Sequence, residues 1–140
     1  MRRSRRAQLA LLCSEDERVR QALAGAGFRI LPAMTAGKAL TLLEKEAVDL
    51  VVADVGTDPR TIDLLNVLPG HRRRKLFAVL LGAGYKTGDR MQAWRESVNL
   101  VVNPEDLGDF EVRVRERMAE EEEFYRPLQQ AVAGLEPASG

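Results

Sequence analysis

Five short runs of apolar residues recur along the chain, and segments of helical periodicity separate them. Strands that alternate with helical segments in this way are typical of βαβ units and a parallel sheet. The runs are continuous rather than alternating, so helices should cover both faces of the sheet. The sequence therefore predicts an α/β fold, a doubly wound five-stranded parallel sheet of (βα)5 type, with strands at Leu9 to Cys13, Phe28 to Leu31, Leu50 to Ala53, Leu76 to Leu81 and Val98 to Val102.

The segments between these runs carry apolar side chains three or four residues apart, as Val19 and Leu23 or Met91 and Trp94 do, so each is predicted to be a helix. Five helices are expected in all. Residues that favour helix ends mark several boundaries: starts at Ser14 and Thr35, and stops at Gly25-Ala26-Gly27 and Pro69-Gly70.

The length of 140 residues suffices for one full hydrophobic core. We expect a basic tail at residues 1–6, one domain at 7–119, and a helical C-terminal extension and tail at 120–140. The 21 basic and 21 acidic residues cancel, so no overall field favours nucleic acid or a membrane. The apolar run after the basic tail is too short for a signal peptide or a membrane span, and the lone Cys13 fits a reducing compartment, so a cytoplasmic location is expected.

Polar or small residues follow four of the predicted strands: Ser14, Asp54, Gly82 and Asn103. The carboxyl ends of parallel strands meet at one edge of a sheet, where ligands bind in doubly wound folds. Glu15, Asp16 and Asp54 could together hold Mg²⁺ there through carboxylate oxygens. Glu15 and Asp16 also suit the first turn of a helix, and Asp54 also suits a tight turn or a helix cap. The sequence leaves both interpretations of Asp54 open.

The order of elements and these strand ends resemble the CheY-like receiver domain of two-component response regulators, which has a flavodoxin-like fold, over residues 7 to 119. Residues 13–20 resemble the acidic turn of that family, residues 48–54 its phosphoacceptor strand, and Asn103-Pro104 its Lys-Pro step. The resemblance implies that Asp54 accepts a phosphoryl group from a histidine kinase and that Mg²⁺ binds at Glu15 and Asp54. It also implies that the family's helix 4, strand 5 and helix 5 form a face that switches and binds partners.

The departures from the family pattern concern the chemistry of that site. Ser14 replaces one acidic residue, Gly82 replaces the hydroxyl residue that ends strand four, and Asn103 replaces the lysine. Leu100 stands where the family has a switching aromatic residue. Because stabilising charge on the transferred group is most of what a protein contributes to phosphoryl transfer, losing the lysine removes a principal source of catalysis. We therefore predict a degenerate receiver, or pseudo-receiver, that is not efficiently phosphorylated.

The helical pattern that begins near Leu107 continues through the glutamate run at 120–123 and beyond, although Pro127 should kink or restart it. An amphipathic helix that overruns its own domain favours a second copy of the chain or another protein as partner. The alternative is that the tail folds back or frays. The predicted interaction surface comprises Leu100, Phe110, Val114, Met118, Phe124, Tyr125 and Leu128.

Two further segments have charge or glycine patterns. The basic run His71 to Lys75 is interpreted as a solvated turn, with a patch for nucleic acid or another anionic partner as the lesser alternative, because no aromatic residues interleave with it. The Gly82 to Gly88 loop lacks the spacing of a phosphate-binding loop and is interpreted as mobile.

The predicted function is a signalling module that acts through protein–protein interaction. A working phosphoacceptor at Asp54 is the first alternative, and a small-ligand or nucleotide sensor at the carboxyl edge of the sheet is the second. No pairing of a nucleophile with a base can be assembled around the lone His71 and Cys13, so no enzymatic activity is expected.

Overall fold

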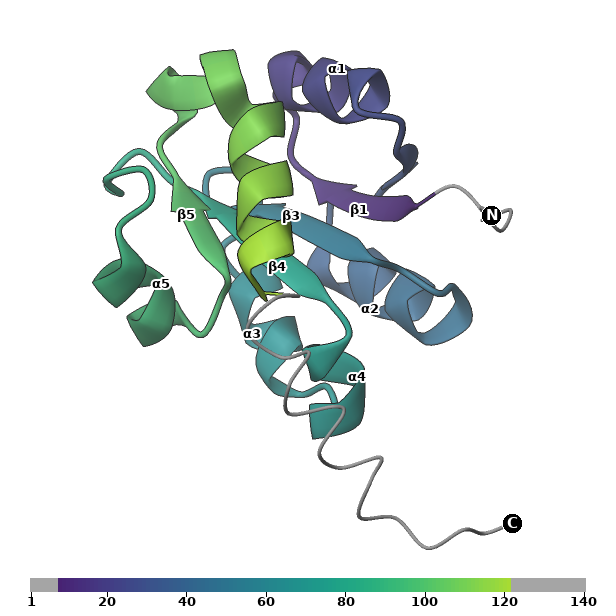
Figure 1. Ribbon diagram of the computed structural model, residues 1–140. Helices are drawn as coiled ribbons and strands as arrows, with labels where there is room; N and C mark the ends of the chain where they lie inside the picture. The colour runs from purple at the N-terminus through teal and green to yellow at the C-terminus, as the bar shows by residue number, and fades with distance from the viewer. Residues whose placement is uncertain (1–7, 122–140) are drawn as a thin grey trace, which may run out of the picture.

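The computed structural model of the protein describes residues 8–121, apart from the side chains at positions 62 and 64. Its centre is a five-stranded sheet in which every pairing is parallel, with the order β2-β1-β3-β4-β5 (Figure 1). This is the α/β fold that the sequence predicts. The strands are β1 (Leu9–Cys13), β2 (Arg29–Pro32), β3 (Leu50–Asp54), β4 (Phe77–Leu81) and β5 (Leu100–Val102).

Three strands begin one or two residues later than predicted. Phe28, Leu76 and Val98 are buried as expected, but their backbone N–H groups do not join the sheet. Each donates instead to a carbonyl of the preceding helical segment: Phe28 to Leu23, Leu76 to Arg73 and Val98 to Ala93. These residues therefore end helices while their side chains fill the core, which apolar patterning alone does not distinguish from a strand.

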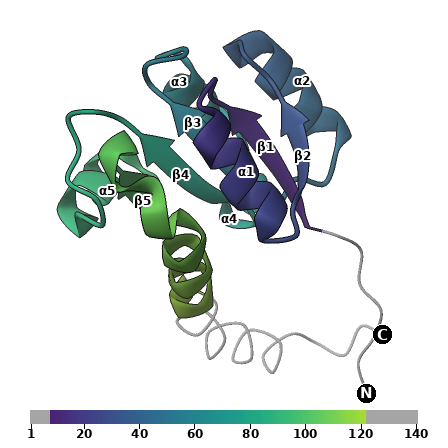
Figure 2. The same ribbon diagram turned by 90° about the horizontal axis from the view of Figure 1, so that it is seen from above.

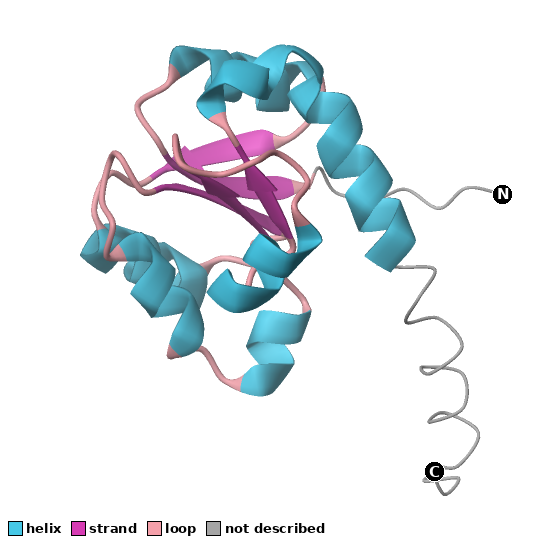
Figure 3. Cartoon of the chain, turned by 90° about the vertical axis from the view of Figure 1, so that its left-hand side faces the viewer, coloured by secondary structure: helices cyan, strands magenta, loops and turns pink. Residues whose placement is uncertain are grey.

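Helices cover both faces of the sheet (Figures 2 and 3). One core layer packs β-strand residues such as Leu12 and Val52 against α1 (Glu17–Gly25) and the last helix, whose described residues are 110–121. The other layer packs the opposite faces of the strands against α2 (Ala36–Lys45), α3 (Thr61–Asn66) and α5 (Arg90–Glu96). Strands β1, β4 and β5 are buried along their length and β3 as far as Ala53, whereas β2 is partly exposed. Strand β2 lies at an edge of the sheet, a position that tolerates Pro32.

Helix starts follow the predicted capping chemistry with one correction. Thr35 caps α2 by accepting the Lys38 N–H, as predicted. The cap of α1 is Asp16, which accepts the Arg18 N–H, and not Ser14, which stands two residues earlier and accepts the Asp16 N–H. A 3-10 helix, η1 (Pro104–Asp109), precedes the last helix.

The basic run forms a short helix, α4 (Gly70–Arg74), so the prediction of a turn there was wrong. Pro69-Gly70, which was predicted to end a helix, follows α3 and also begins α4. Arg72 donates to the Leu43 carbonyl in the last turn of α2. Arg73 donates to the carbonyls of Leu76 and Ser97, the latter at the end of α5. Cationic side chains at helix carboxyl ends satisfy otherwise unpaired carbonyls and interact well with the helix dipole. Two arginines of the run thus tie neighbouring helices together.

The predicted interaction surface needs correction. Leu100, Phe110 and Val114 are only 5%, 0% and 1% exposed, and they belong to the core layer that the last helix covers. Met118 is partly buried against the same layer. Phe124, Tyr125 and Leu128 lie outside the described residues. The stripe predicted to bind a partner is, as far as Met118, the side of the last helix that packs on the sheet. Within residues 8–121, none of the helices combines the length and apolarity needed to cross a bilayer.

Candidate functional site

The candidate site lies at the carboxyl ends of β1, β3, β4 and β5. The chain adds β2 on one side of β1 and β3, β4 and β5 on the other, so the strand order reverses between β1 and β3. Ligands bind at this point in doubly wound sheets. Ser14 follows β1 directly and Asp54 is the last residue of β3. The structure therefore brings these two predicted site residues together.

The Asp54 carboxylate is bonded on both oxygens by its own chain. Oδ2 accepts a hydrogen bond from Ser14 Oγ at 2.8 Å, and Oδ1 accepts one from the Gly56 N–H at 2.9 Å. The bond to Gly56, two residues on, forms the Asx-type turn that was one of the two interpretations of Asp54. Ser14, where the resemblance implies a second acidic residue, is 3% exposed and supplies a donor to this carboxylate instead of a second negative charge.

The two other acidic residues do not converge on Asp54 to form a three-carboxylate site. Asp16 caps α1 and pairs with Arg18 at 2.7 Å, and this pairing lowers the pKa of the Asp16 carboxyl below its ordinary value. The Glu15 side chain is exposed, while its N–H donates to Thr57 Oγ1 at 3.3 Å. Within residues 8–121, no three His, Cys, Asp or Glu side chains are grouped as a metal site requires. Binding of Mg²⁺ by Glu15 and Asp54 stays a prediction.

Gly82, directly after β4, is in close contact with an aromatic ring. A Cβ atom at this position would lie 2.6 Å from Cε2 of Tyr85 and 3.1 Å from Cγ2 of Val55. These distances are shorter than normal contacts, so no larger residue fits without displacing the ring. Burial raises the pKa of the Tyr85 phenol above its ordinary value. The ring of Tyr85 thus takes the space that the family's hydroxyl side chain would need, a contact the sequence did not reveal.

Asn103, after β5, is turned into the loop between β4 and α5. Its Nδ2 donates to the carbonyls of Ala83 and Tyr85 at 3.0 and 2.9 Å, and its Oδ1 accepts the Glu105 N–H and caps η1. The backbone N–H of Asn103 donates to Thr87 Oγ1 at 2.8 Å. The loop that was interpreted as mobile is therefore held by a network of bonds, and the amide of Asn103 is committed to it.

Asp58 is a site residue that the sequence analysis missed. It is 7% exposed, accepts the Ala36 N–H at 3.0 Å, and so ties the start of α2 to the segment after β3. Hydrogen bonds from Arg60 lower the pKa of its carboxyl. Burial, with a smaller contribution from the Asp58 charge, raises the pKa of Cys13 to about 12, which keeps this thiol protonated and unreactive at neutral pH.

A separate surface was also missed. On α5, Met91 and Trp94, whose spacing predicts this helix, are 58% and 77% exposed, and Ala93 is the buried residue of that helix. Met91 and Trp94 are three residues apart on α5, so both lie on one side of this helix.

Comparisons with known proteins identify the fold. No family model matches the sequence, and a search of curated proteins finds no match. A CheY-like response regulator receiver domain from Methanospirillum hungatei matches with a TM-score of 0.66 at 18% identity, over 84% of this chain and 98% of that one. A response regulator from Thermotoga maritima gives 0.64 at 21% identity over 81% and 98%, and an orphan response regulator of H. pylori gives 0.62 at 11% identity over 79% and 95%. The chain has the fold of CheY-like receiver domains, as its sequence predicts.

Proposed function

We propose that this protein is a degenerate receiver-like signalling module that works through protein–protein association and has no enzymatic turnover of its own. Its partner is a second copy of the chain, bound through the α5 face, which we define as Met91 and Trp94 with the adjoining charged residues of α5 and the last helix. The observation that carries the proposal is the exposure of Trp94, at 77%, three residues from Met91 on the same helix. Exposed aromatic side chains are the commonest anchors of protein interfaces.

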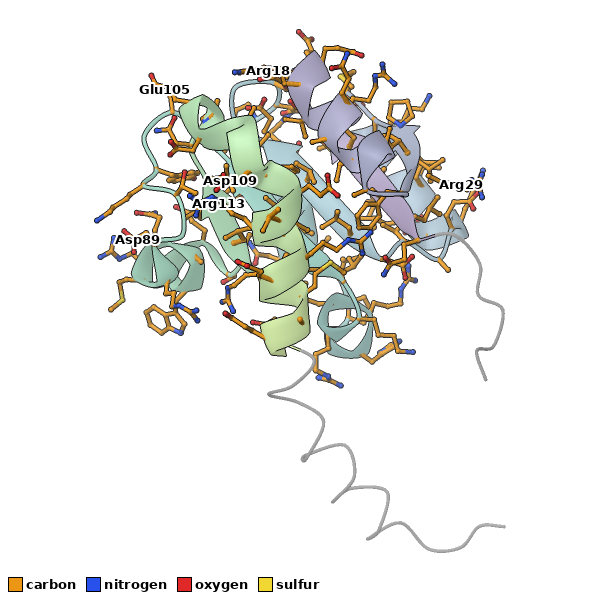
Figure 4. All side chains as sticks on the ribbon, turned by 45° about the horizontal axis from the view of Figure 1, so that its top comes forward. Arg18, Arg29, Asp89, Glu105, Asp109 and Arg113 are labelled. Carbon is orange, nitrogen blue, oxygen red and sulfur yellow. The ribbon has the colours of Figure 1, made fainter. Side chains whose placement is uncertain are left out.

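The charges of the α5 face support a second copy as the partner. Arg90 on α5 pairs with Glu120 on the last helix at 3.0 Å, and Arg113 pairs with Asp109 at 3.0 Å. Figure 4 shows Asp89, Asp109 and Arg113 on the side of the molecule where α5 and the last helix adjoin. A twofold interface joins one surface to itself, so a face that carries both signs of charge can match each with its opposite.

The contacts of the strand-end site support the degenerate part of the proposal. Both oxygens of Asp54 are already hydrogen-bonded, and Tyr85 fills the space beside Gly82. Asn103 stands where the resemblance implies a lysine, and a neutral amide cannot offset the charge of a phosphoryl group. Phosphorylation of Asp54 would have to break the bond from Ser14 without gaining an ammonium group in return.

One observation favours the alternative, a working phosphoacceptor that is addressed by a histidine kinase. Asp54 is half-buried at the carboxyl end of β3, next to the point where the strand order reverses. This is the position that the resemblance implies for the phosphoacceptor. In this alternative, Mg²⁺ bound at Glu15 and Asp54 would supply the positive charge that Asn103 lacks. A sensor of small ligands at this edge has no comparable observation in its favour.

The association can be tested through Trp94, because it is the only tryptophan of the chain. Sedimentation velocity across a concentration series should show a dimer, and the tryptophan emission should move to shorter wavelength over the same series as the indole leaves water. Met91→Ser should weaken the dimer while it keeps the reporter, and Trp94→Ser should abolish the dimer.

Val67→Ser is the matched control, since Val67 is 67% exposed and lies between α3 and α4 in the chain, so it is not part of the α5 face. This variant should dimerise as the unmodified chain does. A chain that stays monomeric with unchanged tryptophan emission would overturn the proposal, as would a dimer that survives both substitutions on α5.

A further inference from the structure

A pocket of about 470 Å³ opens at the other end of the sheet, where the strands begin. We call it the amino-edge pocket. The apolar part of its lining comes from Leu76 and Phe77 at the start of β4 and from Met118 on the last helix. Its volume is in the range of 300 to 1,000 Å³ that is typical of small-molecule sites. Most of the other lining residues are polar or charged.

The oxygen acceptors around this pocket are bonded by the protein itself. Asn99 Oδ1 accepts the Ala78 N–H at 2.8 Å, and Gln8 Oε1 accepts from Arg115 at 2.9 Å. Asp49 Oδ2 accepts the Leu9 N–H at 2.8 Å. Glu121 lies 3.4 Å from the guanidinium of Arg117. All four oxygen-bearing side chains of the lining are therefore directed to internal partners.

Arg115 also lines the pocket and donates to Gln8 and to the Ala26 carbonyl, but two other basic residues of the lining differ from it. Arg74 and Lys75 are exposed lining residues, and within residues 8–121 neither lies within ion-pair distance of a carboxylate. Arg72 and Arg73 of the same run differ from them, because both donate to backbone carbonyls. The pocket thus combines apolar side chains on part of its lining with two cations that have no ion-pair partner among residues 8–121.

We propose that the amino-edge pocket binds a small organic anion, a molecule that carries a carboxylate or phosphate on an apolar body. Lys75 and Arg74 hold the charged group, since ammonium and guanidinium groups form strong charge-assisted hydrogen bonds with such anions. Leu76, Phe77 and Met118 contact the apolar body. The site is separate from the strand-end site around Asp54 and from the α5 face, and it does not depend on either.

The test uses four probes, each followed by amide NMR titration of the full chain. Benzoate and phenyl phosphate carry the two anionic groups on a ring, benzamidine carries the opposite charge on the same ring, and inorganic phosphate lacks the ring. At least one of the two aromatic anions should shift the amides of Leu76, Phe77 and Asn99 saturably. Benzamidine should leave them unchanged, and inorganic phosphate should bind at least about tenfold more weakly, which corresponds to about 1.4 kcal/mol.

Variants locate the charge. Lys75→Met and Arg74→Gln alter exposed side chains and should each raise the dissociation constant of the aromatic anion about tenfold or more. Lys38→Met, which removes an exposed lysine from α2 outside the pocket, should leave it unchanged. The proposal is overturned if neither aromatic anion binds, if benzamidine shifts the same amides as strongly, or if Lys38→Met weakens binding as much as Lys75→Met.

Discussion

At the carboxyl ends of the strands, the polar side chains bond to one another, whereas on α5 two large apolar side chains face water with no partner in the described chain. Asp54, Ser14 and Asn103 each make at least two hydrogen bonds to their own surroundings. Met91 and Trp94 are more than half exposed. The first region is bonded within the chain, whereas the second leaves apolar surface that the proposed dimer would cover.

This difference separates stability from function. Side chains that are hydrogen-bonded within the chain stabilise the fold, so their substitution should lower the free energy of unfolding. A surface that only a partner would cover contributes little to the fold, so a substitution there should change association and leave the free energy of unfolding nearly unchanged. The following substitutions run from the largest expected change in stability to the smallest.

Gly82→Ala should lower the free energy of unfolding by about 1–3 kcal/mol, because the new methyl group would overlap the Tyr85 ring. Tyr85→Ala removes the obstacle, so the same substitution in that background should cost at least about 0.5 kcal/mol less. Urea denaturation of the four proteins of this double-mutant cycle measures the coupling. Gly84→Ala is the control, since a Cβ there meets nothing within 4 Å. Equal costs in both backgrounds would contradict the packing of Tyr85 on Gly82.

Asn103→Ala should cost about 1–2 kcal/mol, because it removes the cap of η1 and two bonds to the β4–α5 loop. Asn103→Lys should be destabilised to a similar degree and should not create a site for a phosphoryl group, since Gly82 and Tyr85 stay in place. Asn66→Ala, at an exposed position at the end of α3, is the matched control. A stable Asn103→Lys variant would show that the amide network is dispensable.

Ser14→Ala should cost about 1 kcal/mol, because the buried hydroxyl both donates to Asp54 and accepts the Asp16 N–H. In an Asp54→Ala background, the bond to the carboxylate is already absent and the cost should fall. Thermal and urea unfolding of both pairs give the comparison. Strictly additive costs would mean that the Ser14–Asp54 bond contributes nothing.

Asp16→Asn keeps a good helix cap and removes a charge, so it should cost only about 0.2–1 kcal/mol at pH 7. Pairing with Arg18 lowers the pKa of Asp16 in the folded state below its unfolded value near 3.9. Its contribution is therefore fully present above that unfolded value and is lost as the pH falls through the folded pKa. Stability measured from pH 7 to pH 2 should show the two proteins converging in acid, and a constant difference would exclude the ion pair as the cause.

Trp94→Ser should change the stability of the monomer by no more than about 0.5 kcal/mol, as expected for an exposed position. Unfolding is best measured at a concentration where the unmodified chain is monomeric, so that association does not add to its stability. A loss comparable to that of Gly82→Ala would show that Trp94 serves the fold of its own chain.

The sequence predicts the sheet well because burial of strands on both faces leaves a local signal, the continuous apolar run. It misplaces the starts of β2, β4 and β5, because Phe28, Leu76 and Val98 fill the core while their backbones end helices. It also misses α4, since a run of basic residues has no apolar stripe. The bonds from Arg72 and Arg73 to neighbouring helices depend on tertiary structure.

The candidate site is predictable in its residues but not in its contacts. The strand ends locate Ser14, Asp54, Gly82 and Asn103, yet nothing in the sequence indicates that Tyr85 packs on Gly82 or that Asp58 reaches the start of α2. On α5, seven residues carry too few apolar side chains to define a face. The small Ala93 is buried there and the larger Met91 and Trp94 are exposed.

The most direct test of the account is an amide NMR titration of the full chain with Mg²⁺ and then with beryllofluoride, a phosphoryl mimic, with Asp54→Ala as the control. Because Ser14 and Gly56 already occupy the Asp54 carboxylate and Asn103 offers no positive charge, the amides of Gly56, Gly82 and Asn103 should not move. Saturable shifts at these residues that extend to α5 and vanish in Asp54→Ala would contradict the account and establish Asp54 as a working phosphoacceptor.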